Sequence, residues 1–501
     1  MRQSNLRICL GGQIKMKIVM NIWGFFQTNI LTQPAFFIGF IVLLGYILMK
    51  KRWYECLAGF LKATVGYFIL TVGSGGLTNT FRPILAGLSD RFGLNAVVID
   101  PYFGQVAAQN AVENLGRSFS MMMSVILVAF LVNIVLVLFR KWTKIRTVFL
   151  TGHIMVLQAS TALWVVLYCF PHLQDIKIVF LMGGLLGVYW SVFSNLTVEP
   201  AQHLTEGANF TLGHSNMLGF WLADKLSSKV GNKSKKVEDM KLPGFLSIFK
   251  ENLVSTSILM LVFFGTIMLI IGKENMQAID DTFTTQNFLF YILQKCLYFA
   301  VYLTILLQGV GLFVNELTYS FNGISSTFLK GAIPAIDCPG LFGYTHGNVI
   351  TLGFLFGALG QFIAIIGLIV FKSPIFIITG FVPVFFDNAV FATIANKNGG
   401  VRGLAVTTFI SGIIQVLGGA IAVAIFGMKE YGGWIGNFDW DTMWPVIGLL
   451  MKNLQYVGIA IVILGMLIIP QLQYKKRKED YFLIVEDYEK YAEKNGIILE
   501  E

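Results

Sequence analysis

Two short stretches, AVVIDP at Ala96–Pro101 and AIPAIDCP at Ala332–Pro339, decide the fold that the sequence predicts. Each joins an apolar run to an Asp and then a Pro, and each follows a glycine, Gly73 or Gly311, at nearly the same offset. When the chain is threaded through a membrane, the first copy starts from the outer face and the second from the inner face. That arrangement indicates an inverted repeat, in which substrate lies between the repeats near the midplane. A chance match of short motifs is the alternative.

The composition is that of a membrane protein. Of the 501 residues, 55% are hydrophobic and 13% are charged, whereas about 25% are charged in an ordinary soluble domain. The mean hydropathy is +0.69. These values exclude a cytosolic enzyme, a disordered chain and a nucleic-acid-binding module, so we expect an all-α polytopic membrane protein.

Apolar runs long enough to cross a bilayer recur along the chain. A hydrocarbon core of about 30 Å needs roughly 17 to 25 apolar residues per helix. The sequence therefore predicts about eleven transmembrane helices, of which the second is short. Their ranges are 34–49, 57–72, 121–139, 148–170, 177–197, 253–271, 289–311, 349–371, 375–395, 403–426 and 446–470.

Basic residues in the connections test this count, because cytoplasmic loops collect Lys and Arg. With eleven spans, every basic cluster falls on one side of the membrane and the acidic loops fall on the other. The clusters lie at 50–52, 140–146, 233–236, 397–402 and 475–478. The basic residues behind the net charge of +9 thus indicate how the chain is oriented in the membrane, with the N-terminus outside and the C-terminus cytoplasmic. Four basic residues before the first span favour the opposite orientation.

Three connections, at 73–120, 199–250 and 312–348, are too long and too mixed in polarity to be plain loops. Irregular backbone at membrane depth is tolerated only where protein or a wet cavity covers it, so we expect re-entrant or surface-lying elements there. The predicted parts of the chain are an N-terminal segment (1–33), a first repeat with a cytoplasmic loop (34–252), a second repeat plus the last helix (253–470) and a charged cytoplasmic tail (471–501).

The five cysteines are widely spaced and show neither a disulfide framework nor metal-ligand spacing. We therefore predict no disulfide, no metal site and no cofactor. The sequence also lacks a Walker A loop, an HExxH motif and a nucleophile elbow, so any phosphoryl group must come from elsewhere. The first 33 residues lack the apolar core of a cleaved signal peptide.

Two histidines are candidates for a site, because an ionisable group in apolar sequence costs about 2.5 to 3.5 kcal/mol without a partner or a wet cavity. His153 lies a few residues into the fourth span, on a strip adjoining Gln158. His153 would either contact a ligand or form its hydrogen bonds with a neighbouring helix. His214 follows Gly213, which lets the backbone turn sharply and present the imidazole with Ser215. A surface-loop histidine is the commoner alternative.

Buried acidic residues form the second group of candidates. Asp337 lies between two prolines in an apolar hairpin, which disfavours a regular helix, so we expect a kinked turn and favour a functional role. Asp387 and Asn388 either cap a broken helix or bind a ligand. Lys295, inside an apolar run, is expected to snorkel or to form a structural ion pair.

These residues belong to ordered blocks that together resemble a known family, the ascorbate-specific membrane subunit (enzyme IIC) of the bacterial sugar phosphotransferase system. The likeness runs from about residue 30 to about residue 460. The blocks are TVGSGGLTNTFRP (Thr71–Pro83), RTVFLTGHIM (Arg146–Met155), GH (Gly213 and His214), Val237–Thr256, FNGIS with AIDC (Phe321–Cys338), and PVFF followed by NA (Pro383–Ala389).

The resemblance implies eleven transmembrane helices in two inverted repeats, divided between a substrate-holding core domain and a V-shaped dimerisation domain. It also implies a homodimer in a bacterial cell membrane that imports L-ascorbate by an elevator motion of the core. A separate IIB protein would phosphorylate the substrate from a phosphocysteine, so the chain would be the membrane component of a phosphotransferase. Membrane lipid would be a further partner, and nucleic acid would not.

Carried onto this sequence, the family's substrate contacts fall in several segments. They are Gly73 and Ser74 of a GSG turn, Tyr102, His153, His214 with Ser215, Asp337, and the backbone near Gly380. Gln158, on the strip beside His153, is a further expected contact. Hydroxyl, imidazole and N–H donors suit an anionic enediol. As a general base, Asp337 would accept the proton of the hydroxyl to be phosphorylated, or His214 would do so instead.

The chain departs from the family at several of these positions. The family has FQQ after GHIM, whereas this chain has Val156, Leu157 and Gln158, so one amide is lost. Ser215 replaces another amide, and Pro101 replaces a Thr before Tyr102. Losing each hydrogen-bonding amide would cost about 1 kcal/mol or more, or signal a different ligand. A secondary carrier that moves unmodified substrate with an ion gradient is the competing hypothesis.

Overall fold

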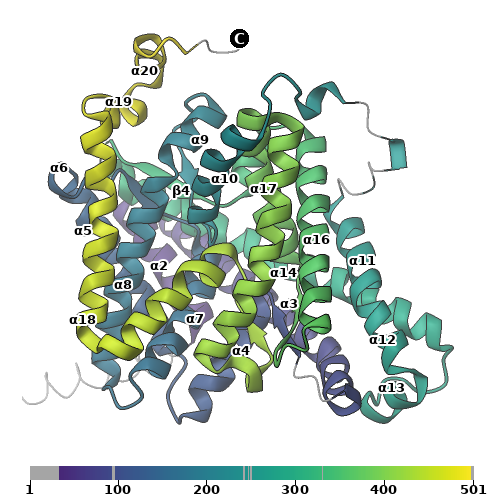
Figure 1. Cartoon of the computed structure of the whole chain (residues 1–501). Helices are drawn as coiled ribbons and strands as arrows, with labels where there is room; N and C mark the ends of the chain where they lie inside the picture. Colours follow the sequence, from purple (N-terminus) through teal and green to yellow (C-terminus); the bar gives the residue numbers. More distant parts are fainter. Residues whose placement is uncertain are drawn as a thin grey trace, which may run out of the picture.

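The structure is a computed structural model that describes residues 33–92, 96–240, 243–245, 248, 251–329 and 331–497. Long helices lie side by side across the molecule, and short strands lie among them (Figure 1). In the first half of the chain the elements are α2 (Pro34–Leu48), α3 (Trp53–Phe92), β1 (Ala96–Ile99), α4 (Pro101–Asn114), α5 (Met121–Leu138), α6 (Arg140–Thr143), β2 (Thr147–Phe149), α7 (Gly152–Cys169), α8 (Asp175–Leu196), α9 (Val198–Thr205), β3 (Thr211–Leu212) and α10 (Met217–Val230).

The second half repeats the alternation of long helices and short strands. Its elements are α11 (Asn252–Met260), a π-helical turn (Leu261–Gly265), α12 (Thr266–Ile271), α13 (Lys273–Ile279), α14 (Phe288–Phe328), β4 (Ile333–Ile336), α15 (Pro339–Phe342), α16 (Gly347–Val370), β5 (Phe376–Thr379), a second π-helical turn (Pro383–Asp387), α17 (Asn388–Phe426), β6 (Gly433–Trp434), α18 (Phe438–Arg477), α19 (Asp480–Glu486) and α20 (Tyr488–Lys494).

Seven helical stretches of the described chain are long and apolar enough to cross a membrane, so the predicted polytopic membrane protein is confirmed. They are Trp53–Gly73, Met121–Leu138, Gly152–Cys169, Asp175–Leu196, Gly347–Val370, Pro383–Phe426 and Phe438–Arg477. The last two, of 44 and 40 residues, exceed the roughly 17 to 25 residues that one crossing needs. Each contains one residue with non-helical backbone, at Gly400 and Gln455.

The predicted turn at Gly73 and Ser74 is wrong, because α3 continues through both residues. Glycine lowers helix propensity by about 1 kcal/mol, but it also lets two helices approach closely. A Cβ at Gly76 would lie 2.2 Å from the Tyr302 ring on α14, and one at Gly309 of α14 would lie 2.4 Å from the Leu70 nitrogen on α3. The glycines here therefore serve the contact between α3 and α14.

The all-α prediction also omits two small sheets, and the predicted helix at 375–395 begins as the strand β5. The residues of β5, Phe-Ile-Ile-Thr, are all buried. A strand covered on both faces has the same continuous apolar run as a buried helix. Periodicity alone therefore could not separate the two.

Strand order links the two halves of the chain. One sheet has the order β5-β1-β6 and the other has the order β2-β4-β3, with every pairing parallel. In each sheet the central strand comes from one half of the chain and both flanking strands come from the other half. Because the strands are parallel, residues that follow the three strands of a sheet gather at one edge.

The charged C-terminal segment folds back onto the helices. Figure 1 shows α19 and α20 at the same end of the molecule as α9. The buried Arg146 guanidinium donates to the Tyr481 carbonyl at 2.5 Å and lies 3.6 Å from the Tyr481 ring. Apolar side chains of α19 and α20 form a cluster with α9 and β4. Its members are Val198, Ile333, Ile484, Val485, Tyr488, Tyr491 and Ala492.

Candidate functional site

Three predicted site residues meet at the carboxyl edge of the β2-β4-β3 sheet. His153 is the second residue of α7, which follows β2, and Asp337 comes directly after β4. His214 follows β3 through Gly213, whose N–H donates to the Ile336 carbonyl at 2.7 Å. A Cβ on Gly213 would lie 2.7 Å from the Ala335 oxygen, so only glycine allows this close approach.

The two imidazoles face the same carboxylate. Nε2 of His153 lies 3.3 Å from Oδ2 of Asp337, and Nε2 of His214 lies 3.7 Å from Oδ1. Both histidine side chains are buried, whereas the Asp337 side chain keeps 29% of its surface exposed. The carboxylate is therefore the accessible member of the cluster, and the imidazoles hold it from two sides.

Burial sets the charge of His214. Desolvation lowers the pKa of His214 to about 4, against an opposing effect of the Asp337 charge that raises it. His214 is therefore neutral near pH 7, with one ring nitrogen available as an acceptor. The Nδ1 atoms of both His153 and His214 are buried and have no hydrogen-bond partner in the described part of the chain.

Gln158 and Ser215, two further predicted contacts, bind each other. Nε2 of Gln158 donates to Oγ of Ser215 at 2.9 Å, and Nε1 of Trp190 donates to Oε1 of Gln158 at 2.5 Å. All three side chains are buried. This chain of hydrogen bonds fixes the amide of Gln158 close to the segment that carries His214.

Tyr102 and Gly380 lie at the corresponding edge of the other sheet. Asp100, directly after β1, accepts hydrogen bonds from the backbone N–H groups of Tyr102 at 3.0 Å and Val382 at 3.3 Å. A Cβ on Gly380 would lie 2.4 Å from the Asp100 side chain. The Asp after β1 thus accepts from backbone N–H groups, whereas the Asp after β4 accepts from the Cys338 N–H and also faces two histidines.

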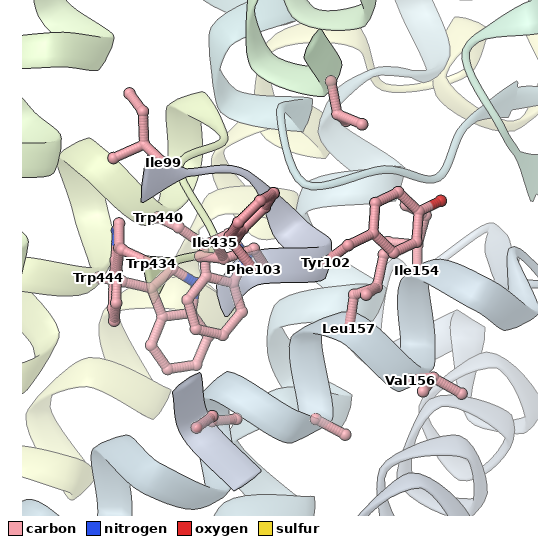
Figure 2. Close-up of a cluster of buried hydrophobic side chains, with 14 of the residues drawn as sticks. Ile99, Tyr102, Phe103, Ile154, Val156, Leu157, Trp434, Ile435, Trp440 and Trp444 are labelled. Carbon is pink, nitrogen blue, oxygen red and sulfur yellow. The ribbon is translucent and has the colours of Figure 1, made fainter. Parts of the chain in front are cut away.

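Tyr102 also connects the two edges. Its ring stands beside Ile154 and Leu157 of α7 (Figure 2), next to the segment that bears His153. Burial raises the pKa of Tyr102 first, and the charges of Asp100 and Asp337 raise it further. Gly73 and Ser74, in contrast, lie within α3.

Sequence analysis missed the role of Asp387. Its Oδ1 accepts from Nδ2 of Asn216 and from Nδ2 of Asn437, each at 2.8 Å, and its Oδ2 accepts from the Phe438 N–H at 2.8 Å. Asn216 and Asn437 occupy the residue before α10 and before α18. Asp387 therefore ties together the helix starts that follow β3 and β6, and it caps α18 instead of its own helix.

Lys295 forms the predicted structural ion pair. Its Nζ lies 2.7 Å from Oδ2 of Asp280, and the hydroxyl of Tyr291 donates to the same oxygen at 2.6 Å. Asp280 also accepts from Thr282. Burial alone would raise the pKa of Asp280, but these donors outweigh it and lower the pKa to about 2.

Comparison with known proteins assigns the chain to a family. Residues 29–442 match EIIC-GAT, described as the PTS system sugar-specific permease component. A protein of Mycoplasma pneumoniae named "Ascorbate-specific PTS system EIIC component" is 31% identical over 427 residues, which cover 78% of this chain. The chain spans 64% of the length of that relative. The chain belongs to the EIIC-GAT family of sugar-specific permease components of the phosphotransferase system.

Proposed function

We propose that this chain imports L-ascorbate, or a related small hydroxylated anion, and presents it for phosphorylation by a separate IIB protein. The observation that carries the proposal is the meeting of His153, His214 and Asp337 after three strands of one sheet. These groups can both accept hydrogen bonds from hydroxyls and take up a proton.

Unpartnered buried atoms around the sheet edges support a hydroxyl-rich ligand. Nδ1 of His153, Nδ1 of His214 and the hydroxyls of Thr151 and Thr379 have no hydrogen-bond partner among the described residues. A buried polar atom without a partner costs about 1 to 3 kcal/mol. Hydroxyls of a sugar acid would satisfy such atoms, which an apolar ligand would not.

The proposed chemistry assigns Asp337 as the general base. It accepts the proton of the substrate hydroxyl while that oxygen forms a bond to phosphorus and the sulfur–phosphorus bond of the phosphocysteine on IIB breaks. The partial exposure of Asp337 leaves it accessible for this step. His214 is the alternative base, because it is neutral near pH 7.

The proposal includes two inverted repeats, at 34–252 and 253–470, with eleven transmembrane helices and an elevator motion of the core. The exchange of strands supports it, since β1 is flanked by strands of the second half and β4 by strands of the first. The proposed orientation in the membrane places the C-terminus in the cytoplasm. Figure 1 supports it, because α6, α9, α19 and α20 lie toward one end of the molecule and α13 lies toward the other. The basic clusters at 140–146 and 475–478 belong to the first end, which we assign to the cytoplasm.

A homodimer is also part of the proposal. Helices α2, α3 and α14 pack on one another, and apolar side chains on this unit stay exposed. Leu44, Leu61 and Val72 keep 59%, 49% and 63% of their surface. Such a face suits either lipid or the second copy in a V-shaped dimerisation domain.

Transport with a defined donor tests the function. Proteoliposomes that contain the chain are loaded with phosphorylated IIB and given labelled ascorbate outside, with unphosphorylated IIB as the control. We expect phosphorylated ascorbate inside, and only with the phosphorylated donor. Accumulation of free ascorbate without product would contradict the proposal and favour a secondary carrier.

A further inference from the structure

The proposed sugar chemistry leaves one side chain of the cluster unused. Cys338 follows Asp337, is fully buried and carries a free thiol. Ligand atoms of His214, Asp337 and Cys338 all lie within 4.8 Å of one another. His153 lies beside this group, with its Nε2 3.3 Å from Oδ2 of Asp337, and is not one of its three members.

We propose that His214, Asp337 and Cys338 bind a divalent transition-metal ion of the Zn²⁺ class, with water in the fourth position, and that the bound ion excludes the sugar. Zn²⁺ takes four N, S or O ligands in tetrahedral geometry at about 2.0 to 2.3 Å, which places neighbouring ligand atoms roughly 3.3 to 3.8 Å apart. The distance of 3.7 Å between Nε2 of His214 and Oδ1 of Asp337 falls in that range.

The ligand types select the metal. One imidazole, one carboxylate and one cysteine sulfur favour Zn²⁺ and similar ions, whereas Mg²⁺ and Ca²⁺ prefer oxygen ligands.

Sequence spacing could not indicate this site, because its ligands come from two separate segments. His214 follows β3, whereas Asp337 and Cys338 follow β4, and the parallel pairing of these strands brings their carboxyl ends together. The fold, and not a sequence motif, assembles the donor set.

The groups that surround the proposed ligands favour an exchangeable metal ion over a permanently bound structural one. Metal-binding histidines usually donate their second ring N–H to a partner, and loss of such a partner weakens binding about 10- to 100-fold. Nδ1 of His214 has no hydrogen-bond partner in the described chain. The ion is therefore a reversible competitor for the imidazole of His214 and the carboxylate of Asp337, a part of the inference that rests on the proposed function.

Cobalt titration of the purified full chain in detergent tests the metal site. Co²⁺ is a spectroscopic probe for Zn²⁺ sites, and a cobalt–thiolate bond gives a near-ultraviolet charge-transfer band. We expect this band to saturate at a single equivalent of Co²⁺ and to disappear when Zn²⁺ is added. Cys338→Ser should abolish the band, whereas Cys169→Ser, which changes a buried free cysteine outside the cluster, should leave it unchanged.

The absence of the band in the unmodified chain, or its persistence in Cys338→Ser, would overturn the metal proposal. Gel filtration and thermal melting check that each variant is folded. His214→Gln is the second variant, and we expect Co²⁺ binding about 10-fold weaker or more; unchanged binding would also overturn the site. In a separate arm, Zn²⁺ should raise the apparent Kd for ascorbate. If Zn²⁺ binds as expected but leaves this Kd unchanged, the metal site stands and the sugar site lies elsewhere.

Discussion

Asp337 and Asp100 occupy matching positions after the central strands of the two sheets, but their surroundings differ. Asp100 is 2% exposed and accepts two backbone hydrogen bonds. Asp337 accepts one backbone hydrogen bond, from the Cys338 N–H at 2.7 Å, remains partly exposed and meets two imidazoles. A partly exposed carboxylate with one backbone donor keeps acceptor capacity and can exchange a proton with a ligand, whereas a buried one committed to two backbone N–H groups fixes a turn. Equivalent places in the two halves thus have different tasks.

The first prediction concerns the proposed base. Asp337→Asn removes the proton acceptor but keeps the shape of the side chain, so we expect the rate of ascorbate phosphorylation to fall at least about 100-fold. Ascorbate affinity should change much less. The measurement is the initial rate with phosphorylated IIB in proteoliposomes. Asp175→Asn, at an exposed helix start, is the control, and an unchanged rate in Asp337→Asn would transfer the role of base to another group such as His214.

The second prediction concerns Leu157, which stands where the family has an amide. Leu157 is 2% exposed and points toward Tyr102 (Figure 2). Leu157→Gln adds hydrogen-bonding groups beside the site, so we expect ascorbate to bind about 10-fold more tightly, equivalent to about 1 kcal/mol. Binding to the purified chain measures this. Leu163→Gln, also buried on α7, should only lower the Tm; equal affinity in Leu157→Gln and the unmodified chain would point to a ligand other than ascorbate.

At the scale of elements, the loop between α13 and α14 depends on one ion pair. Lys295→Met leaves Asp280 buried without its cation, and we expect the free energy of unfolding to fall by about 3 kcal/mol near pH 7. Because the folded pKa of Asp280 is about 2, below the ordinary value near 3.8, its stabilising effect is present above pH 3.8. The effect is lost as the pH falls from 3.8 toward 2.

Thermal melts of the unmodified chain and Lys295→Met at several pH values measure this effect. The difference in Tm should be constant from pH 7 to 5 and should shrink from pH 4 to 3. Lys273→Met, in the neighbouring helix α13, is the control and should melt like the unmodified chain throughout. A difference that grows on acidification would contradict the assigned role of Asp280.

The sequence predicts most helices but not the short strands, and the reason is visible at β4 and β5. Four apolar residues flanked by helices carry no period of their own, so their pairing depends on partners far along the chain. Asp337 and His153 stand out because polar residues in apolar runs are costly. Asp387 stands out equally, yet its task could not be predicted, since its partners Asn216 and Asn437 become neighbours only after both sheets form.

At the scale of the whole molecule, the exchange of strands makes the two halves interdependent. Neither central strand can pair without strands of the other half. The C-terminal segment adds a third contribution, because it covers Arg146 directly before β2 and Ile333 at the start of β4. The opposite ends of these two strands lead to His153 and Asp337.

The last prediction concerns the C-terminal segment that covers Arg146 and Ile333. Removing residues 479–501 exposes the apolar cluster of α9, β4, α19 and α20 and takes the Tyr481 carbonyl and ring away from the buried Arg146. Burial of each large apolar side chain contributes about 1.5 to 3 kcal/mol, so we expect the Tm of the shortened chain to fall by several degrees. Tyr481→Phe, the matched variant, keeps the ring over Arg146 and loses only the hydroxyl, which donates to the Lys144 carbonyl at 2.7 Å and accepts from Nδ2 of Asn195 at 2.8 Å. This variant should lower the free energy of unfolding by about 1 to 2 kcal/mol. Equal melting of the shortened and full chains would show that the segment rests on the helices without stabilising the sheet beneath it.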